Sequence, residues 1–165
     1  MENSCWVYRN EECGIKINRV PIYFERDAEE GDADNGTTTF RSGSQFDEIW
    51  GPDATITVSW EKTNRMTYHH GKKVRETINM YNAINVGIVK KETEWLQSHE
   101  CTFWWGQRKH MKKGHLYGSH LIHSIMLCEQ TSRVVEVDAR VIENRFPNYE
   151  KLILEFMRSI VCHEA

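Results

Sequence analysis

Residues 117–128 (YGSHLIHSIMLC), 134–141 (VVEVDARV) and 147–162 (PNYEKLILEFMRSIVC) decide the fold of this chain. In the second stretch valines alternate with charged residues, which is the two-residue period of a β-strand, and the first reads as its partner across the turn at 129–133. The third stretch begins with proline, a residue favoured at the first helical position. Its apolar residues then recur at helical spacing. The segment therefore predicts a strand, a turn, a strand and a closing helix.

The rest of the chain extends this pattern towards the N-terminus. Short strands are predicted at 14–18, 22–24 and 37–40, longer ones at 54–62, 88–97 and 101–112, a helix at 72–86, and a solvated acidic loop at 25–36. Hairpin connections between strands imply antiparallel pairing. We therefore expect one α+β domain over residues 1–165, an α/β/α sandwich in which helices flank a mostly antiparallel sheet.

Composition narrows the classes of function. The 165 residues carry a formal net charge of −3, and a protein that binds phosphate backbones usually has a basic excess, so nucleic acid is not the expected partner. No run approaches the ~20 apolar residues of a membrane span, and the first residues lack the basic and apolar regions of a signal peptide. We expect a cytoplasmic protein with no membrane partner. Its five cysteines are then expected as free thiols.

The N-terminal region carries a resemblance to a known family. Tyr8, Asn10 and Gly14 form a Y-x-N-x-x-x-G turn that leads into a strand, with Pro21 and Tyr23 after it. This opening, the strand at 54–61 and the closing strand, hairpin and helix resemble PsbP-like domains, a family that includes an extrinsic subunit of photosystem II and a Ran-binding nuclear import factor. The resemblance covers the order of elements along nearly the whole chain. It implies an antiparallel sheet between helices and a non-enzymatic docking role on a protein partner.

A basic run next to two tryptophans is the expected docking surface. Its residues are Trp104, Arg108, Lys109, Lys112 and Lys113. Basic and aromatic side chains together bind acidic protein surfaces or single-stranded nucleic acid. Because neighbouring residues of a strand face opposite ways, at least one ring of the Trp104–Trp105 pair is expected to leave the core. A salt contact with the acidic stretch at 25–34, within one molecule or between two, is an alternative use of the same charges.

A metal or thiol redox site is the alternative function. The strand histidines do not make a local site, since His120 and His123 are three residues apart and therefore face opposite sides of a strand. Residues distant in sequence offer a better set: Cys101 begins a strand, Cys128 ends one, and Cys162 and His163 follow the closing helix. If they meet at one edge of the sheet, they form a site for zinc or a disulfide.

An enzyme is the least favoured class. The sequence has no G-x-S-x-G nucleophile elbow, no H-E-x-x-H helix and no phosphate-binding loop. Glu136 and Asp138 alternate with the valines of their strand and are expected on its solvated face. A small hydrolase would instead require a deep pocket that contains a histidine or carboxylate with a perturbed pKa.

Overall fold

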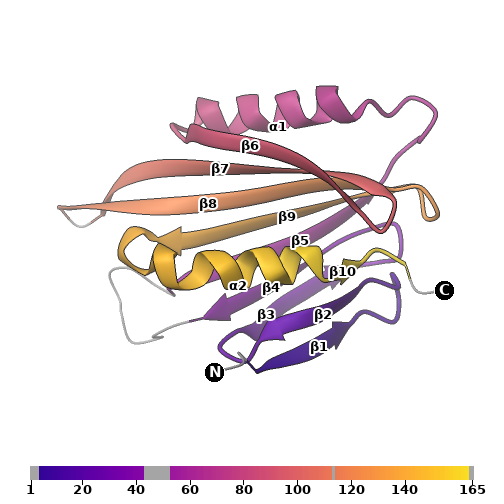
Figure 1. Ribbon diagram of the computed structural model, residues 1–165, viewed down its shortest axis with the longest axis horizontal. Coiled ribbons are helices and arrows are strands. Elements are labelled where there is room, and N and C mark those ends of the chain that lie inside the picture. The colour runs from indigo at the N-terminus through magenta and orange to yellow at the C-terminus, as the bar shows by residue number, and fades with distance from the viewer. Residues whose placement is uncertain (1–3, 43–52, 113, 164–165) are drawn as a thin grey trace.

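The fold is a sandwich of helix, sheet and helix, with a second small sheet beside the second helix (Figure 1). The structure is a computed structural model that describes residues 4–42, 53–112 and 114–163. No helix within these ranges is long and apolar enough to cross a membrane.

Seven strands form the large sheet in the order β3-β4-β5-β9-β8-β7-β6, and each neighbouring pair is antiparallel. The strands are β3 (Glu25–Gly31), β4 (Asn35–Ser42), β5 (Ala54–Lys62), β6 (Gly87–Leu96), β7 (His99–Lys112), β8 (His115–Cys128) and β9 (Arg133–Ile142). The small sheet has the order β1-β2-β10, from β1 (Cys5–Arg9), β2 (Lys16–Pro21) and β10 (Ile160–Val161). The helices are α1 (His70–Ala83) and α2 (Phe146–Arg158), the latter preceded by a 3₁₀ turn at Glu143–Arg145.

The closing unit forms as its sequence predicts. The odd-numbered valines of β9 are buried against α2, and β8 pairs with β9 along ten residue pairs from Ser119↔Ile142 to Cys128↔Arg133. Helix α2 buries Leu152, Ile153, Phe156 and Met157 on one stripe. It ends at Arg158, earlier than predicted, because Ile160 and Val161 pair with β2 instead of continuing the helix.

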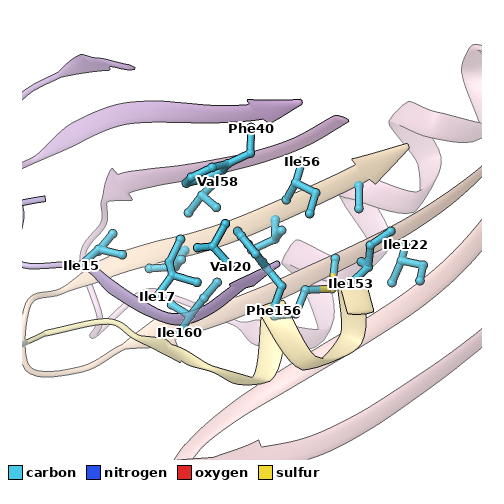
Figure 2. Close-up of a cluster of buried hydrophobic side chains, with 14 of the residues drawn as sticks. Ile15, Ile17, Val20, Phe40, Ile56, Val58, Ile122, Ile153, Phe156 and Ile160 are labelled. Atoms are coloured by element: carbon cyan, nitrogen blue, oxygen red, sulfur yellow. The ribbon is translucent and has the colours of Figure 1, made fainter. Parts of the chain in front are cut away.

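The main core lies between the large sheet on one side and α2 with the small sheet on the other. Figure 2 shows Ile17 and Val20 of β2, Ile56 and Val58 of β5 and Phe156 of α2 packed together. The ring of Phe156 meets that of Phe40 edge to face at 5.4 Å. This arrangement adds directional aromatic contact to the burial of both rings.

The opposite face of the sheet is covered by α1 over β6, β7, β8 and part of β9. Val74 packs on Ile125 and Val134, while Tyr81 packs near Trp104 and Leu121. The sheet is therefore buried on both faces at β7. Trp104 faces α1 and Trp105 faces α2, and both are buried, so the expectation that one ring leaves the core is wrong.

Two predicted segments differ in the structure. The acidic stretch at 25–36 is not a loop, because Glu25–Gly31 forms edge strand β3 with every residue exposed. Charge on an edge strand discourages pairing with another chain, which explains why so acidic a sequence tolerates the strand conformation. Helix α1 stops at Ala83, and Asn85, not Gly87, takes the left-handed conformation after it with φ 66°.

Candidate functional sites

A projecting two-stranded arm is the first candidate site. Strand β6 pairs with β7 only as far as Gln107, and β9 pairs with β8 only from Ser119 onwards. Strands β7 and β8 nevertheless continue to pair with each other as far as Lys112↔His115. Residues 108–112 and 114–118 therefore continue as a strand pair that has no further strand paired on either side within the described residues, at the left in Figure 1. We call this segment the arm.

The arm combines positive charge with exposed apolar side chains. The sequence from 101 to 128 contains no Asp or Glu but includes Arg108 and Lys109, followed by two further lysines. Met111 and Leu116 are cross-strand partners, and they are 68% and 66% exposed. Lys109 Nζ lies 2.9 Å from a carboxylate oxygen of Glu143, and both side chains are largely exposed. An exposed ion pair of this kind contributes little to stability.

Only part of the sequence-predicted docking surface lies on the arm. Arg108 and Lys109 are there, whereas the side chain of Lys112 and all of Lys113 lie outside the described residues. Trp104 does not belong to this surface. It is fully buried beneath α1, 4.8 Å from the ring of Tyr81 and stacked on His123 at 5.1 Å. The sequence reading missed this because it did not assign a helix to that face of β7.

A cluster of two cysteines and two histidines is the second candidate site. His99 begins β7 directly after a hairpin turn in which Gln97 and Ser98 both have positive φ. Cys128 ends β8 at the same end of the sheet, and Cys162 and His163 follow β10. One possible ligand atom from each of the four residues lies within 4.8 Å of all the others. Three of the four residues proposed from sequence therefore meet, and His99 takes the place of Cys101.

The donor atoms of the cluster are in direct contact. Nδ1 of His163 is 3.3 Å from Sγ of Cys128 and 3.3 Å from Sγ of Cys162, and Nε2 of His99 is 3.5 Å from Sγ of Cys162. The two thiols interact strongly: a hydrogen bond from Cys162 lowers the pKa of Cys128, and the same bond raises the pKa of Cys162. His99 is 4% exposed, and its Nδ1 has no hydrogen-bond partner among the described residues.

Cys101 misses the cluster because of strand geometry. It lies opposite Met126 on β8, two residues further from the sheet end than His99. Two residues of strand correspond to about 6–7 Å, which is beyond the reach of a short thiol side chain. Burial instead raises the pKa of the Cys101 thiol to about 12. The same hairpin register, continued by two residues on each strand from Cys101↔Met126, places His99 opposite Cys128.

Arg133 supports the cluster from beneath. It begins β9 opposite Cys128, is 3% exposed, and donates from Nη2 to the carbonyl of Cys162 at 3.0 Å. From Nη1 it donates to the carbonyl of Ala33 in the β3–β4 turn at 2.8 Å. A single guanidinium thus connects the segment after β10 to the β3–β4 turn, which is distant from it in sequence. Its planar fork suits two separate carbonyl acceptors.

A polar cavity beside α1 is the third candidate site. It has a volume of about 610 Å³ and is lined by α1, by β8 and β9, and by the hydroxyl-bearing faces of β4 and β5. His123 forms part of its wall, with Nε2 3.3 Å from Glu136 Oε1 and Nδ1 3.8 Å from Asp138 Oδ2. The hydroxyl of Tyr81 donates to Asp138. Glu136 and Asp138 are therefore enclosed against a histidine, not solvated as their alternation suggested.

The two carboxyl groups of this cavity have opposite pKa shifts. Burial raises the pKa of Asp138, although Arg140 opposes the effect. Burial also acts to raise the pKa of Glu136, but the hydrogen bond and charge of His123, with help from Lys73, outweigh burial and leave it lowered. A carboxyl pair separated in this way next to a histidine has the properties of a proton-transfer site. The hydrolase alternative requires a perturbed carboxyl group, which is present here, but also a deep pocket, whereas this one is widely open to solvent.

The fold, unlike the sequence, matches known structures. A scan against protein-family models finds no match, and a search of curated protein sequences finds none either. Among solved structures, cyanobacterial PsbP (CyanoP) from Synechocystis is 12% identical over 96% of this chain and 92% of its own, with a TM-score of 0.66. The Saccharomyces cerevisiae Ran-binding protein Mog1p is also 12% identical, over 98% of this chain and 96% of its own, with a TM-score of 0.60.

A third structural neighbour comes from Pseudomonas aeruginosa. This protein of unknown function, described as a putative regulator, is 14% identical over 97% of this chain and 98% of its own, with a TM-score of 0.60. At identities this low, the comparison shows a shared architecture and does not match individual residues. The matches span nearly the whole of every chain compared, so the order and packing of the elements are shared throughout. The chain therefore has the α+β fold of PsbP and Mog1p, as its opening motif and closing unit predicted.

Proposed function

We propose that this chain is a non-enzymatic accessory module that docks on an acidic surface of a protein partner through its arm. The observation that carries the proposal is the projection of the arm beyond β6 and β9, with Met111 and Leu116 exposed side by side. Exposed apolar side chains rimmed by charge are typical of protein interaction sites.

Charge indicates the chemistry of the partner. The arm carries Arg108 and Lys109, and its sequence adds Lys112 and Lys113, within a chain whose formal net charge is −3. A local basic surface on an otherwise acidic protein orients the molecule towards an acidic partner. The acidic strand β3 does not reach the arm within one molecule, since β4, β5 and β9 separate β3 from β8 and four strand spacings amount to roughly 19 Å. The fold relationship to a Ran-binding protein is consistent with a docking role but does not identify the partner.

Site-specific crosslinking tests the proposal. A photo-crosslinking amino acid replaces Met111 on the arm or, as a matched control, Met66, which is 84% exposed outside the arm. In extract from the native cell, position 111 should crosslink one acidic protein that position 66 does not. Crosslinking of a second copy of this chain would assign the arm to self-association and overturn the proposal. Equal patterns at the two positions would also overturn it.

Charge reversal provides a quantitative second measurement. The arm variant replaces Arg108, Lys109, Lys112 and Lys113 with glutamate, and the control variant replaces Lys72, Arg75, Lys90 and Lys91 with glutamate. Both change the net charge equally, so a difference between them reports position and not total charge. Capture of the crosslinked partner should be abolished by the arm variant, retained by the control, and weakened by salt in the wild type. Capture unchanged by the arm variant would contradict the proposal.

A further inference from the structure

We propose that His99, Cys128, Cys162 and His163 bind one zinc ion as a closed Cys₂His₂ site that joins three distant segments of the chain. The site is independent of the docking role, and either can fail without the other. The proposal rests first on convergence: the donor atoms come from the start of β7, the end of β8 and the segment after β10, and all four lie within 4.8 Å of one another.

The separations between the donor atoms fit tetrahedral zinc. Zinc binds sulfur at about 2.3 Å and nitrogen at about 2.0–2.1 Å, and these lengths at a tetrahedral angle place sulfur and nitrogen about 3.6 Å apart. The three sulfur–nitrogen contacts in the cluster measure 3.3, 3.3 and 3.5 Å. These three contacts therefore need only small outward shifts of side chains, and the remaining donor pairs already lie within 4.8 Å.

The donor set selects the class of metal. Two sulfurs and two imidazole nitrogens in a compact tetrahedral arrangement suit zinc, whereas magnesium and calcium require oxygen ligands. Binding forms two Zn–S and two Zn–N bonds, and the protons carried by the two thiols pass to solvent, with no change of oxidation state. Two thiolates balance the charge of Zn²⁺, so the buried site becomes neutral.

Burial indicates a structural site. Cys128 and Cys162 are fully buried and His99 is 4% exposed, so four protein donors leave no position for a substrate. His99 also lines a cavity of about 760 Å³ at the surface, which provides a route for the ion to reach the cluster. Buried cysteines often act as small apolar side chains. That reading does not explain why two histidine nitrogens face the same sulfur.

The alternative chemistry at this position is a disulfide between Cys128 and Cys162. It would use two of the four donor groups, and the buried imidazole of His99 would then have no thiol or metal ion as a partner. The zinc site uses all four groups and therefore accounts for more of the arrangement. The two states are distinguishable, since a disulfide consumes two thiols permanently under non-reducing conditions and zinc only protects them.

The first test is the metal content of the full chain, purified without an affinity tag. Elemental analysis should find about one zinc per chain. After chelation, Co²⁺ should restore the site with the intense visible bands of tetrahedral thiolate coordination, and zinc should displace them. Two of the five thiols should be protected from alkylation until a chelator is added. Less than a tenth of an equivalent of tightly held metal, with no cobalt spectrum, would overturn the proposal.

Matched variants assign the ligands. His99→Ala and His163→Ala should each lower the affinity for zinc by more than the roughly 10–100-fold loss that follows removal of an outer-shell partner. Cys101→Ala is the control, because Cys101 is an equally buried cysteine on the same strand as His99 but lies outside the cluster. It should retain full zinc binding. Equal losses in Cys101→Ala and His99→Ala, or a Cys128–Cys162 disulfide found by mass spectrometry in protein kept from air, would overturn the assignment.

Discussion

Arg133 is the residue whose replacement tests the structure most directly. Its guanidinium is 3% exposed and donates to the carbonyls of Ala33 at 2.8 Å and Cys162 at 3.0 Å. Arg133→Met keeps an unbranched apolar stem but removes both donors. The carbonyl of Cys162 is then left in the protein interior without its partner, which costs more than the loss of a bond that water could replace, whereas Ala33 is exposed and its carbonyl can bind water instead.

The magnitude follows from these two contacts. A hydrogen bond to a charged group contributes about 1.5–3 kcal/mol, so the pair contributes about 3–6 kcal/mol. Burying the methionine side chain returns about 1.5–3 kcal/mol, which leaves a net loss of about 1.5–3 kcal/mol in the free energy of unfolding. With a urea m-value of about 2–3 kcal/mol/M, the unfolding midpoint should fall by about 1 M.

The assay is urea unfolding followed by tryptophan fluorescence, in the presence of a chelator so that metal binding does not contribute. The control is Arg65→Met, which makes the same chemical change at an exposed residue and should change the free energy by less than about 0.5 kcal/mol. If Arg133→Met were no more destabilising than this control, the two hydrogen bonds would not stabilise the fold and the reasoning would be refuted.

Two further predictions concern the two faces of the sheet. Asp138→Asn should raise stability relative to the wild type at neutral pH but not in acid. Burial raises the pKa of Asp138 in the folded state above its value in the unfolded state. The wild type therefore has its full stability below the unfolded-state pKa and loses part of it as the pH rises through the folded-state pKa. Asparagine keeps one acceptor oxygen, for either Tyr81 or Arg140, which donate to different oxygens of Asp138. Thermal unfolding across pH measures the difference, and a gap that does not widen with pH would contradict the role of burial. Phe156→Ala, at a fully buried ring in contact with Phe40, should cost about 3–5 kcal/mol, measured by urea unfolding. A loss below about 1 kcal/mol would mean that α2 does not pack on the sheet as described.

The elements with one clear period were predictable from sequence. Strand β9 alternates valine with charge, and α2 places Ile153 and Phe156 on a single stripe, so both were identified with their buried faces. Boundaries were less predictable, because tertiary pairing decided them: α2 stops at Arg158 where β10 begins to pair with β2. Strand β3 was missed because its stability comes from pairing with β4 and not from apolar residues of its own.

The candidate sites depended on which face of the sheet each helix covers. The odd spacing of His120 and His123 correctly predicted that they lie on opposite faces of β8. The alternation of faces alone does not show that α1 lies over Trp104, Glu136 and Asp138. Three members of the cluster, Cys128, Cys162 and His163, were predicted because they lie at or just after the ends of elements that meet at one end of the sheet. His99 was missed because it lies between the predicted strands at 88–97 and 101–112, although the register of β7 and β8, continued by two residues from Cys101↔Met126, places it opposite Cys128.

The pairing of β10 with β2 has a consequence for how the chain folds. Ile160 pairs with Ile17, and Ser159 accepts a hydrogen bond from the backbone N–H of Asn18, so these contacts close a loop of more than 140 residues. Closing so long a loop is entropically costly until the intervening sheet has ordered the chain. The three-stranded sheet should therefore be acquired late, and amide exchange in β2 should report the same global opening as β10 although the two strands lie at opposite ends of the sequence.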